Sequence, residues 1–229
     1  MKIGLLQFPG SNCDQDCIDA FRRHYSIELQ TIWHTETTLP SVKGIIIPGG
    51  FSYGDYLRSG ALASHSPVMQ EVVRFAGRGG PIMGVCNGFQ VLTESKLLPG
   101  ALLKNASQKF ICKTVALFGE SGNSAWHKSL KGAVTRLPIA HGQGRYHCDE
   151  ETLAKITDRN QIVVRYCSID GKFSDACNPN GSMRAIAGIV SESGKIFGLM
   201  PHPERATDVL TGGSSDGLRY WKSFIDLCS

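Results

Sequence analysis

Residues 81–90, PIMGVCNGFQ, constrain the fold more than any other stretch of the chain. A short apolar strand runs into Gly84-Val85-Cys86-Asn87-Gly88, whose glycines allow a tight bend from which a helix begins. A residue at such a bend is strained and lies beside the free N–H groups of the helix. Both features favour the thiolate form of a cysteine. The segment therefore predicts Cys86 as a nucleophile at the carboxyl end of a strand.

A simpler interpretation is that Cys86 belongs to the core. Cysteine is among the most often buried residue types. The chain contains 26 glycines, so a Gly-x-Cys-x-Gly pattern at the end of a core strand can arise by chance. Other parts of the chain have to decide between a nucleophile and a core cysteine.

The hydrophobic pattern alternates between strand and helix along most of the chain. Residues 45–47 are three successive isoleucines, as expected for a strand covered on both faces. The alternation predicts one α/β domain over residues 1–229, with a doubly wound, mostly parallel sheet and an antiparallel hairpin near the C-terminus. The expected strands are 3–8, 27–33, 43–48, 109–118, 134–140, 161–166, 185–190 and 195–200. The expected helices include 57–64, 67–76 and 89–97; Asp14 or Asn12 should cap the first helix, and 120–131 should be a loop.

Composition excludes several classes of function. The formal charge is +4, from 24 basic and 20 acidic residues that are interspersed, which argues against a nucleic-acid-binding surface. The eight cysteines are irregularly spaced and contain no C-x-x-C pair, so neither a disulfide scaffold nor a metal site is expected. No apolar run approaches the ~18 residues of a membrane span. We therefore expect a cytoplasmic protein that binds neither membrane nor nucleic acid.

A glycine-rich loop, Gly49-Gly50-Phe51-Ser52-Tyr53-Gly54-Asp55, directly follows the third expected strand. Ligands bind at the carboxyl ends of strands in open α/β sheets, and the N–H groups of Gly50 and Phe51 could face a developing oxyanion there. A plain turn is the alternative. The chain has neither the Gly-x-x-x-x-Gly-Lys-Ser/Thr nor the Gly-x-Gly-x-x-Gly pattern, so an ATP or dinucleotide site is unsupported.

A cysteine nucleophile needs a base, and the base needs a partner that orients it. Of the seven histidines, His202 is distinctive because it lies between Pro201 and Pro203 and precedes Glu204 by two residues. In an extended stretch, residues i and i+2 point the same way, so one carboxylate could hold one imidazole. A rigid turn with a buried structural histidine is the alternative. The cysteine bend, the glycine-rich loop and this pair together form one active-site plan.

With these motifs the chain resembles the triad (class I) glutamine amidotransferases, and within them the glutaminase subunits of phosphoribosylformylglycinamidine synthase. The resemblance spans nearly the whole chain. It departs at Gln143, where the family has glutamate in His-Gly-Glu-Gly-Arg, and this puts in doubt any coupling role of that corner. The segments that carry it are GVCNGFQ (84–90), PHPE (201–204), GGFSYGD (49–55), PGSNCD (9–14), PIAHG (138–142) and MPHPERA (200–206).

The resemblance implies a Cys86–His202–Glu204 triad that hydrolyses glutamine and releases ammonia. The oxyanion would be held by the N–H of Asn87 together with that of Gly50 or Phe51. The residues implied to hold glutamine are Gln90, Asn105, Ser107 and Phe110.

The resemblance also implies partners. A separate, larger synthetase subunit (PurL type) would use ATP and Mg²⁺ to convert formylglycinamide ribonucleotide to formylglycinamidine ribonucleotide in purine biosynthesis. A small bridging subunit (PurS type) is a further expected partner, and no cofactor is expected in this chain. Two alternatives remain at this stage: a DJ-1-like cysteine hydrolase or redox sensor, and a catalytically silent regulatory module of the same fold.

Overall fold

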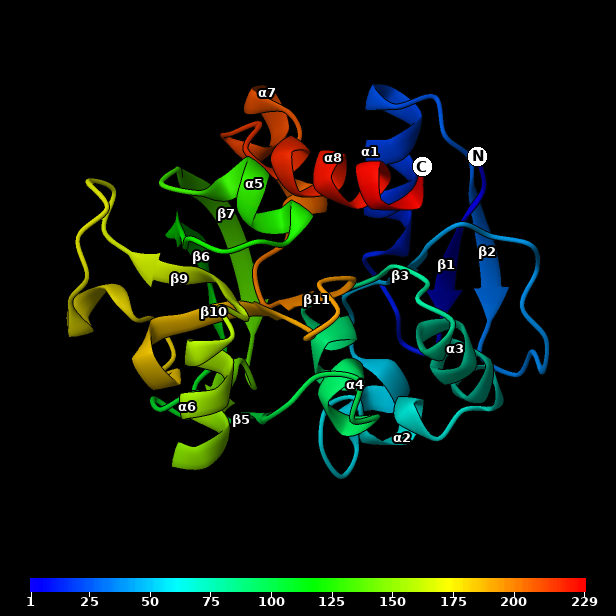
Figure 1. Ribbon diagram of the computed structural model, residues 1–229, viewed down its shortest axis with the longest axis horizontal. Coiled ribbons are helices and arrows are strands. Elements are labelled where there is room, and N and C mark those ends of the chain that lie inside the picture. Colours follow the sequence, from blue (N-terminus) through cyan, green and yellow to red (C-terminus); the bar gives the residue numbers. More distant parts are fainter.

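The computed structural model describes all residues from 1 to 229 and shows a large central sheet with helices on both faces (Figure 1). Its nine strands lie in the order β2-β1-β3-β4-β11-β10-β9-β6-β7, and β5 pairs with β8 in a separate two-stranded sheet. The strands are β1 (Ile3–Gln7), β2 (Leu29–Trp33), β3 (Ile45–Ile47), β4 (Ile82–Val85), β5 (Ala101–Leu103), β6 (Ile111–Gly119), β7 (Val134–His141), β8 (Arg145–His147), β9 (Ile162–Cys167), β10 (Ile186–Val190) and β11 (Ile196–Leu199). The α/β architecture with one large central sheet is confirmed.

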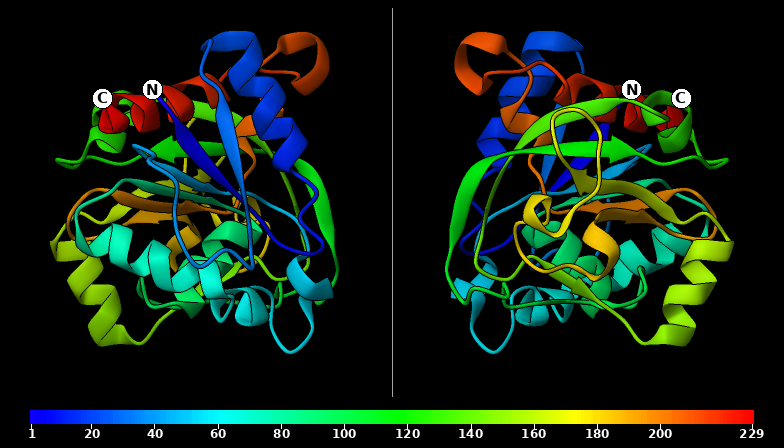
Figure 2. Two further views of the ribbon diagram at one scale, coloured as in Figure 1. Left: turned by 90° about the vertical axis from the view of Figure 1, so that its right-hand side faces the viewer. Right: turned by 90° about the vertical axis from the view of Figure 1, so that its left-hand side faces the viewer.

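The helices form two layers. Helices α1, α5 and α8 lie on one face of the sheet, and α2, α3 and α4 lie on the other (Figures 1 and 2). This arrangement confirms the doubly wound type. The helices are α1 (Asp14–His24), α2 (Ala61–Ser64), α3 (Pro67–Gly77), α4 (Asn87–Glu94), α5 (Ala125–Leu130), α6 (Glu150–Asp158), α7 (Val209–Gly212) and α8 (Gly217–Cys228). None of them combines the length and apolar character needed to cross a membrane.

One half of the sheet is parallel and carries the strands that the sequence predicts most clearly. Strand β1 pairs with β2 and β3, β3 pairs with β4, and β4 pairs with β11, all in parallel. All three residues of β3 are fully buried, as expected for a strand covered on both faces. The carboxyl ends of β1, β3, β4 and β11 therefore meet along one edge of the sheet.

The other half is antiparallel. The predicted C-terminal hairpin is confirmed, with Gly188 opposite Leu199 in β10 and β11. The antiparallel pairing then continues through β9, β6 and β7, which is more than the one hairpin expected. The long β6–β7 ladder begins where Ile111 lies opposite His141. It thereby brings the corner after β7 toward the parallel half.

Three local expectations are wrong. Residues 120–131 are not all loop, because α5 forms there with Ser124 as its cap, accepting from the His127 N–H, and with Trp126 packed against Phe197 at 4.5 Å between ring centroids. Of the helix expected over 57–64, only the last four residues, α2, are helical. Leu57 is largely exposed with a φ of 68°, so no core contact holds a helix there.

The third concerns the start of α1. Its N-cap is Cys13, with no side-chain cap hydrogen bond. The Asp14 carboxylate instead accepts a hydrogen bond from the Gln7 side chain. The side-chain oxygen Oδ1 of Asn12 accepts from the Cys13 thiol at 3.2 Å. Neither predicted residue caps the helix.

Candidate active site

Cys86 lies at a strained bend between β4 and α4. Its φ of 51° and ψ of −104° are far from helix or strand values, and such a conformation costs about 1–3 kcal/mol in a non-glycine residue. The glycines on either side are required by space. A Cβ on Gly84 would lie 2.7 Å from the carbonyl oxygen of Gly88, and one on Gly88 would lie 2.0 Å from that of Ile47. The sequence motif therefore folds as the strand–turn–helix bend that it predicts.

The bend buries Cys86 where three strands meet. Its N–H donates to the carbonyl of Leu199 at the end of β11, at 2.8 Å, and its Sγ lies 3.8 Å from the carbonyl oxygen of Ala140 in β7. Only 4% of the residue is exposed. Main-chain groups of β11 and β7 thus hold Cys86 in place at the edge where the strands end.

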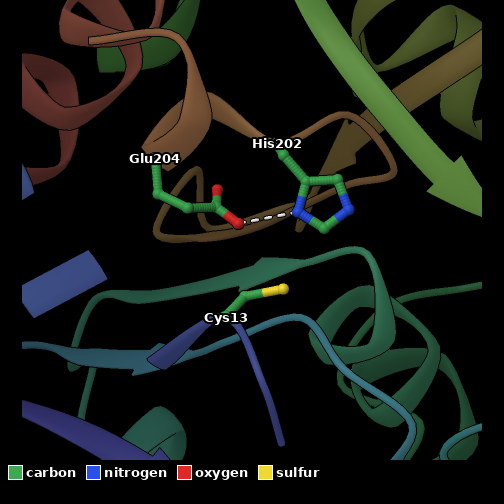
Figure 3. Close-up of side chains that lie close together, drawn as sticks. All are labelled: Cys13, His202 and Glu204. Atoms are coloured by element: carbon green, nitrogen blue, oxygen red, sulfur yellow. Dashed lines mark hydrogen bonds and ion pairs between the residues drawn. The ribbon is translucent and has the colours of Figure 1, made fainter. Parts of the chain in front are cut away.

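His202 and Glu204 form a buried pair after β11. Nδ1 of His202 lies 2.7 Å from Oε1 of Glu204, and the two side chains are 2% and 0% exposed (Figure 3). They meet across the single 3₁₀ turn η4 (Pro203–Arg205), whereas the sequence argument assumed an extended stretch. The N–H of His202 donates to the carbonyl of Pro138, at 2.8 Å, which ties this loop to β7.

The electrostatic surroundings favour the charged imidazole. Burial by itself lowers the pKa of His202, but the nearby Glu204 carboxylate and Cys86 thiol outweigh it and raise that pKa well above its ordinary value. Because Glu204 occupies Nδ1, the other ring nitrogen, Nε2, remains for Cys86, and it has no hydrogen-bond partner. Nε2 is therefore the ring nitrogen that is free to exchange a proton while Glu204 holds the ring orientation.

The glycine-rich loop after β3 lies beside this pair. A Cβ on Gly49 would come within 2.8 Å of His202 Cε1, so the loop packs directly on the imidazole. The N–H of Phe51 donates to the carbonyl of Gly10 at 2.9 Å, whereas the N–H of Gly50 makes no main-chain hydrogen bond. The N–H of Asn87 opens α4, where the first N–H groups have no acceptor within the helix. Of the three N–H groups predicted to face an oxyanion, those of Gly50 and Asn87 are therefore without a main-chain acceptor and that of Phe51 is bonded.

The side chains of Asn87 and Gln90 connect the bend to its neighbours. Oδ1 of Asn87 accepts from the N–H of Ser52 at 3.2 Å, and its Nδ2 donates to Oε1 of Gln90 at 2.8 Å. Nε2 of Gln90 donates to the main-chain carbonyl of Gln143 at 2.6 Å. Because Gln143 takes part through its main chain, its departure from the family's glutamate does not remove this link.

The other residues implied to hold glutamine lie in different settings. The side chain of Asn105 is buried and already bonded to Lys109, His141 and Gly144, so it fastens the corner after β7 and has no free polar atom. Ser107 and Phe110 are exposed, and together with Phe51 they form what we call the rim of the site. The Phe110 and Phe51 rings, 54% and 42% exposed, lie 6.3 Å apart.

His141 is a second buried histidine near the site. Its Nδ1 lies 3.0 Å from Oδ1 of Asn105, and burial together with the charge of His202 lowers its pKa to about 4. It is therefore neutral at pH 7. The corner after β7 thus places the neutral imidazole of His141 near the charged imidazole of His202.

Sequence reasoning assigned no role to Cys13, which the structure places against the His202–Glu204 pair. The ligand atoms of Cys13, His202 and Glu204 all lie within 4.8 Å of one another (Figure 3). Nη2 of Arg205 donates to the Cys13 sulfur at 3.3 Å. Burial raises the pKa of the Cys13 thiol, although His202 and Arg205 partly oppose this. The available signal was its position just after β1, at the same edge as the other loops.

Fold and geometry together define a class of protein. A buried cysteine at a strained bend, an imidazole held by a carboxylate and free N–H groups beside the sulfur are the parts needed for acyl transfer through a thioester. Such an arrangement can attack the carbonyl carbon of an amide and release its nitrogen.

Comparison with known proteins identifies the family. Residues 1–216 match the CobB/CobQ-like glutamine amidotransferase domain, and the chain belongs to this family. It is 49% identical to the phosphoribosylformylglycinamidine synthase subunit PurQ of Salinibacter ruber over 226 residues, covering 98% of this chain and 96% of that protein. Its identity to the PurQ subunit of Methanosarcina barkeri is 47%, over 99% of this chain and 97% of that protein.

Solved structures agree with this assignment. A chain of the PurLQS structure from Thermotoga maritima superposes with a TM-score of 0.86 at 41% identity, covering all of this chain and 99% of that one. A putative GMP synthase subunit from Thermoplasma acidophilum has a TM-score of 0.64 at 12% identity, covering all of this chain and 94% of that one, which shows the shared fold alone.

Proposed function

We propose that this chain is the glutaminase subunit of a phosphoribosylformylglycinamidine synthase, with Cys86, His202 and Glu204 as its catalytic triad. The observation that carries the proposal is the buried His202–Glu204 pair, 2.7 Å between Nδ1 and Oε1, at the same edge as the strained Cys86. The similarity to the PurQ subunit of Salinibacter ruber, 49% identical over nearly the full length of both chains, supports glutamine as the substrate.

The geometry supports a two-step reaction. The Cys86 sulfur attacks the side-chain amide carbon of glutamine, and the N–H groups of Gly50 and Asn87 stabilise the oxyanion, each such donor being worth about 3–4 kcal/mol. The C–N bond breaks as His202 donates its proton to the departing nitrogen, which leaves ammonia and a thioester. His202 then takes a proton from water, which attacks the thioester and releases glutamate, while Glu204 keeps the ring in place.

The glutamine contacts proposed from the family resemblance are Gln90, Asn105, Ser107 and Phe110. The structure supports different contributions from them. Ser107 and Phe110 are exposed at the rim and available to a ligand, whereas Asn105 and Gln90 are buried with their amides bonded to the corner 141–144. The first two would touch glutamine and the last two would hold the wall of its site.

The ammonia would be used by another subunit. The related Thermotoga maritima structure is a PurLQS complex, which supports a PurL-type synthetase and a PurS-type subunit as partners. Because this chain lacks a phosphate-binding glycine motif, ATP and Mg²⁺ would bind to the synthetase, and the chain itself would carry no cofactor. All eight cysteines are free, which is in keeping with the reducing environment of the cytoplasm.

Labelling with the glutamine analogue 6-diazo-5-oxo-norleucine tests the assignment of the nucleophile. With the synthetase partner present, mass spectrometry of a tryptic digest should place the adduct on Cys86. An adduct on Cys13 would instead identify Cys13 as the nucleophile. A protein with no adduct would be a redox sensor or a silent module, and the glutaminase assignment would be wrong.

The variant His202→Ala tests the separation of the two reactions. It should abolish synthesis of formylglycinamidine ribonucleotide from glutamine and preserve synthesis from added ammonium chloride, because the synthetase site lies elsewhere. Loss of both activities would show instead that His202 serves folding or assembly.

A further inference from the structure

We propose that Cys13, His202 and Glu204 form a Zn²⁺ site whose occupation switches the active site off. The inhibitory effect rests on the proposed function of His202 as the base, whereas metal binding itself does not. Cys13 takes no part in the reaction described above, yet its sulfur lies close to the hydrogen-bonded His202–Glu204 pair (Figure 3).

The three ligand atoms lie near enough for a metal site to form after shifts of up to about 1 Å. The three ligand atoms lie within 4.8 Å of one another, and tetrahedral zinc with bonds of about 2.0–2.3 Å needs them about 3.3–3.6 Å apart. Zinc would take the position of the proton between Nδ1 and Oε1, which are 2.7 Å apart and would have to separate by about half an ångström. Oε2 of Glu204 is buried without a partner, so the carboxylate can turn to share either oxygen.

The ligand types select for zinc. A thiolate, an imidazole and a carboxylate suit Zn²⁺, whereas Mg²⁺ prefers oxygen ligands and keeps most of its water. All three side chains are at least nine-tenths buried, which excludes an ion that retains its hydration shell. The Mg²⁺ expected on a synthetase partner should therefore not compete for this site.

Charge and access are also compatible with a bound cation. Arg205 faces Cys13, but its Nε donates to Asp16 at 2.8 Å, which balances the guanidinium charge. A surface pocket of about 490 Å³ reaches from solvent to Glu204 and is lined by Asp16, Asp19 and Arg205 among others. An ion entering from this pocket would not pass Cys86, but the Glu204 side chain is fully buried, so the η4 turn would have to move to admit it.

Zinc binding would change the proton positions on His202. The metal displaces the Cys13 thiol proton and the Nδ1 proton, both of which go to solvent, and it is coordinated by the sulfur, by the Nδ1 lone pair and by Glu204. The neutral ring then carries its remaining proton on Nε2. Nε2 can no longer accept a proton, so the reaction stops although Cys86 is free.

The sequence prediction of no metal site used the spacing of neighbouring cysteines. Cys13 and His202 lie near opposite ends of the chain, so that rule could not detect them. Only the adjacency of β1 to β3 and the packing of the loop after β11 bring them together.

Direct metal binding is the decisive test. Chelator-treated protein is titrated with Zn²⁺ against a chromophoric chelator, and with Co²⁺ to observe the thiolate charge-transfer band. Wild type and Cys86→Ser should bind one equivalent equally well, and Cys13→Ser should bind about a hundredfold more weakly, since it lacks the thiolate. The control Cys112→Ser removes an exposed cysteine and should bind as wild type.

Inhibition is then measured in the assembled complex with saturating Mg²⁺, each variant relative to its own zinc-free rate. Zn²⁺ should inhibit glutamine-dependent synthesis by wild type and Cys112→Ser and should lose most of its effect on Cys13→Ser. Normal zinc binding by Cys13→Ser, or its loss in Cys86→Ser, would overturn the proposal. If Cys86 is labelled by the glutamine analogue but zinc does not bind, only the zinc site falls; if zinc binds but Cys86 is not labelled, only the glutaminase assignment falls.

Discussion

Cys13 and Cys86 approach the same histidine from structurally similar places. Each follows a parallel strand, each is the N-cap of a helix and each is buried. They differ in the backbone, since φ is −107° at Cys13 and 51° at Cys86, and in their neighbours. Cys86 lies beside free N–H groups, whereas Cys13 lies beside the Glu204 carboxylate and the Arg205 guanidinium.

This difference supports the proposed choice of Cys86 as the nucleophile, because both cysteines have a helix N-terminus and a nearby histidine. At Cys86 the strained bend begins α4, so the thiol lies beside main-chain N–H groups that can stabilise an oxyanion, and Nε2 of His202 has no other hydrogen-bond partner. Cys13 has a negative φ, and its sulfur lies near a histidine whose Nδ1 is already bonded to Glu204. Proximity to His202 is therefore shared, and the surrounding main chain separates the two roles.

Replacing each cysteine by alanine should give the largest contrast. Cys86→Ala should lower glutamine-dependent kcat by a factor on the order of 10⁴ or more, because no other group can form the thioester. Ammonia-dependent synthesis by the complex should persist. Cys13→Ala should still be labelled at Cys86 by the glutamine analogue. Steady-state rates with glutamine and with ammonium chloride measure the contrast, and a Cys86→Ala enzyme that retains glutaminase activity would reverse the assignment.

Replacing Glu204 by glutamine tests the other side of the ring. Glu204→Gln should lower kcat by about 10² to 10⁴ with little change in KM, because the charge that supports the imidazolium is lost. Since Glu204 raises the pKa of His202, the basic limb of the pH–rate profile should move to lower pH. Asp16→Asn is the control, because it removes a carboxylate that contacts Arg205 and not His202. An equal shift in both profiles would refute the role of Glu204.

The oxyanion donor at Gly50 is the next test. Its φ of 147° is a conformation that favours glycine, and an added Cβ would lie 2.7 Å from the Cα of Ser11. Gly50→Ala should therefore displace the N–H and lower kcat by about 10² to 10³. Gly132→Ala provides the control for backbone strain alone, because its φ is 69° and its Cβ would meet nothing within 4 Å. If the two variants have similar kcat values, Gly50 is only a turn residue.

The parts of the site that short motifs encode were predictable from sequence. Bend, loop and His–Glu pair each lie within a few consecutive residues, and local spacing was enough to find them. The position of Cys13 after the first strand indicates only that it lies at the same edge of the sheet, and its approach to His202 was missed because it depends on strand order. The same applies to α5, where Trp126 finds its partner Phe197 far along the chain, and to the antiparallel half, whose pairing is set by long-range contacts.

The smallest expected effect concerns the neutral imidazole beside Cys86. The pKa of His141 is about 4 in the folded chain, against an ordinary value of 6.5, so the unfolded chain binds the proton first as the pH falls. Stability is therefore lost between pH 6.5 and 4, and His141 should account for about 2 kcal/mol of the loss between pH 7 and 5. The raised pKa of His202 acts in the opposite direction, since its contribution is present at low pH and declines as the pH rises.

The contribution of His202 is common to wild type and His141→Asn, so it cancels when the acid-induced losses of stability of the two proteins are compared. Asparagine can still offer an amide N–H toward Asn105, so the corner should keep its fold at a lower overall stability. Urea unfolding at pH 7 and pH 5 should show a smaller acid-induced loss in His141→Asn than in wild type. An identical loss in both would mean that the pKa of His141 is not lowered in the folded protein, and the neutral state assigned to this imidazole would be wrong.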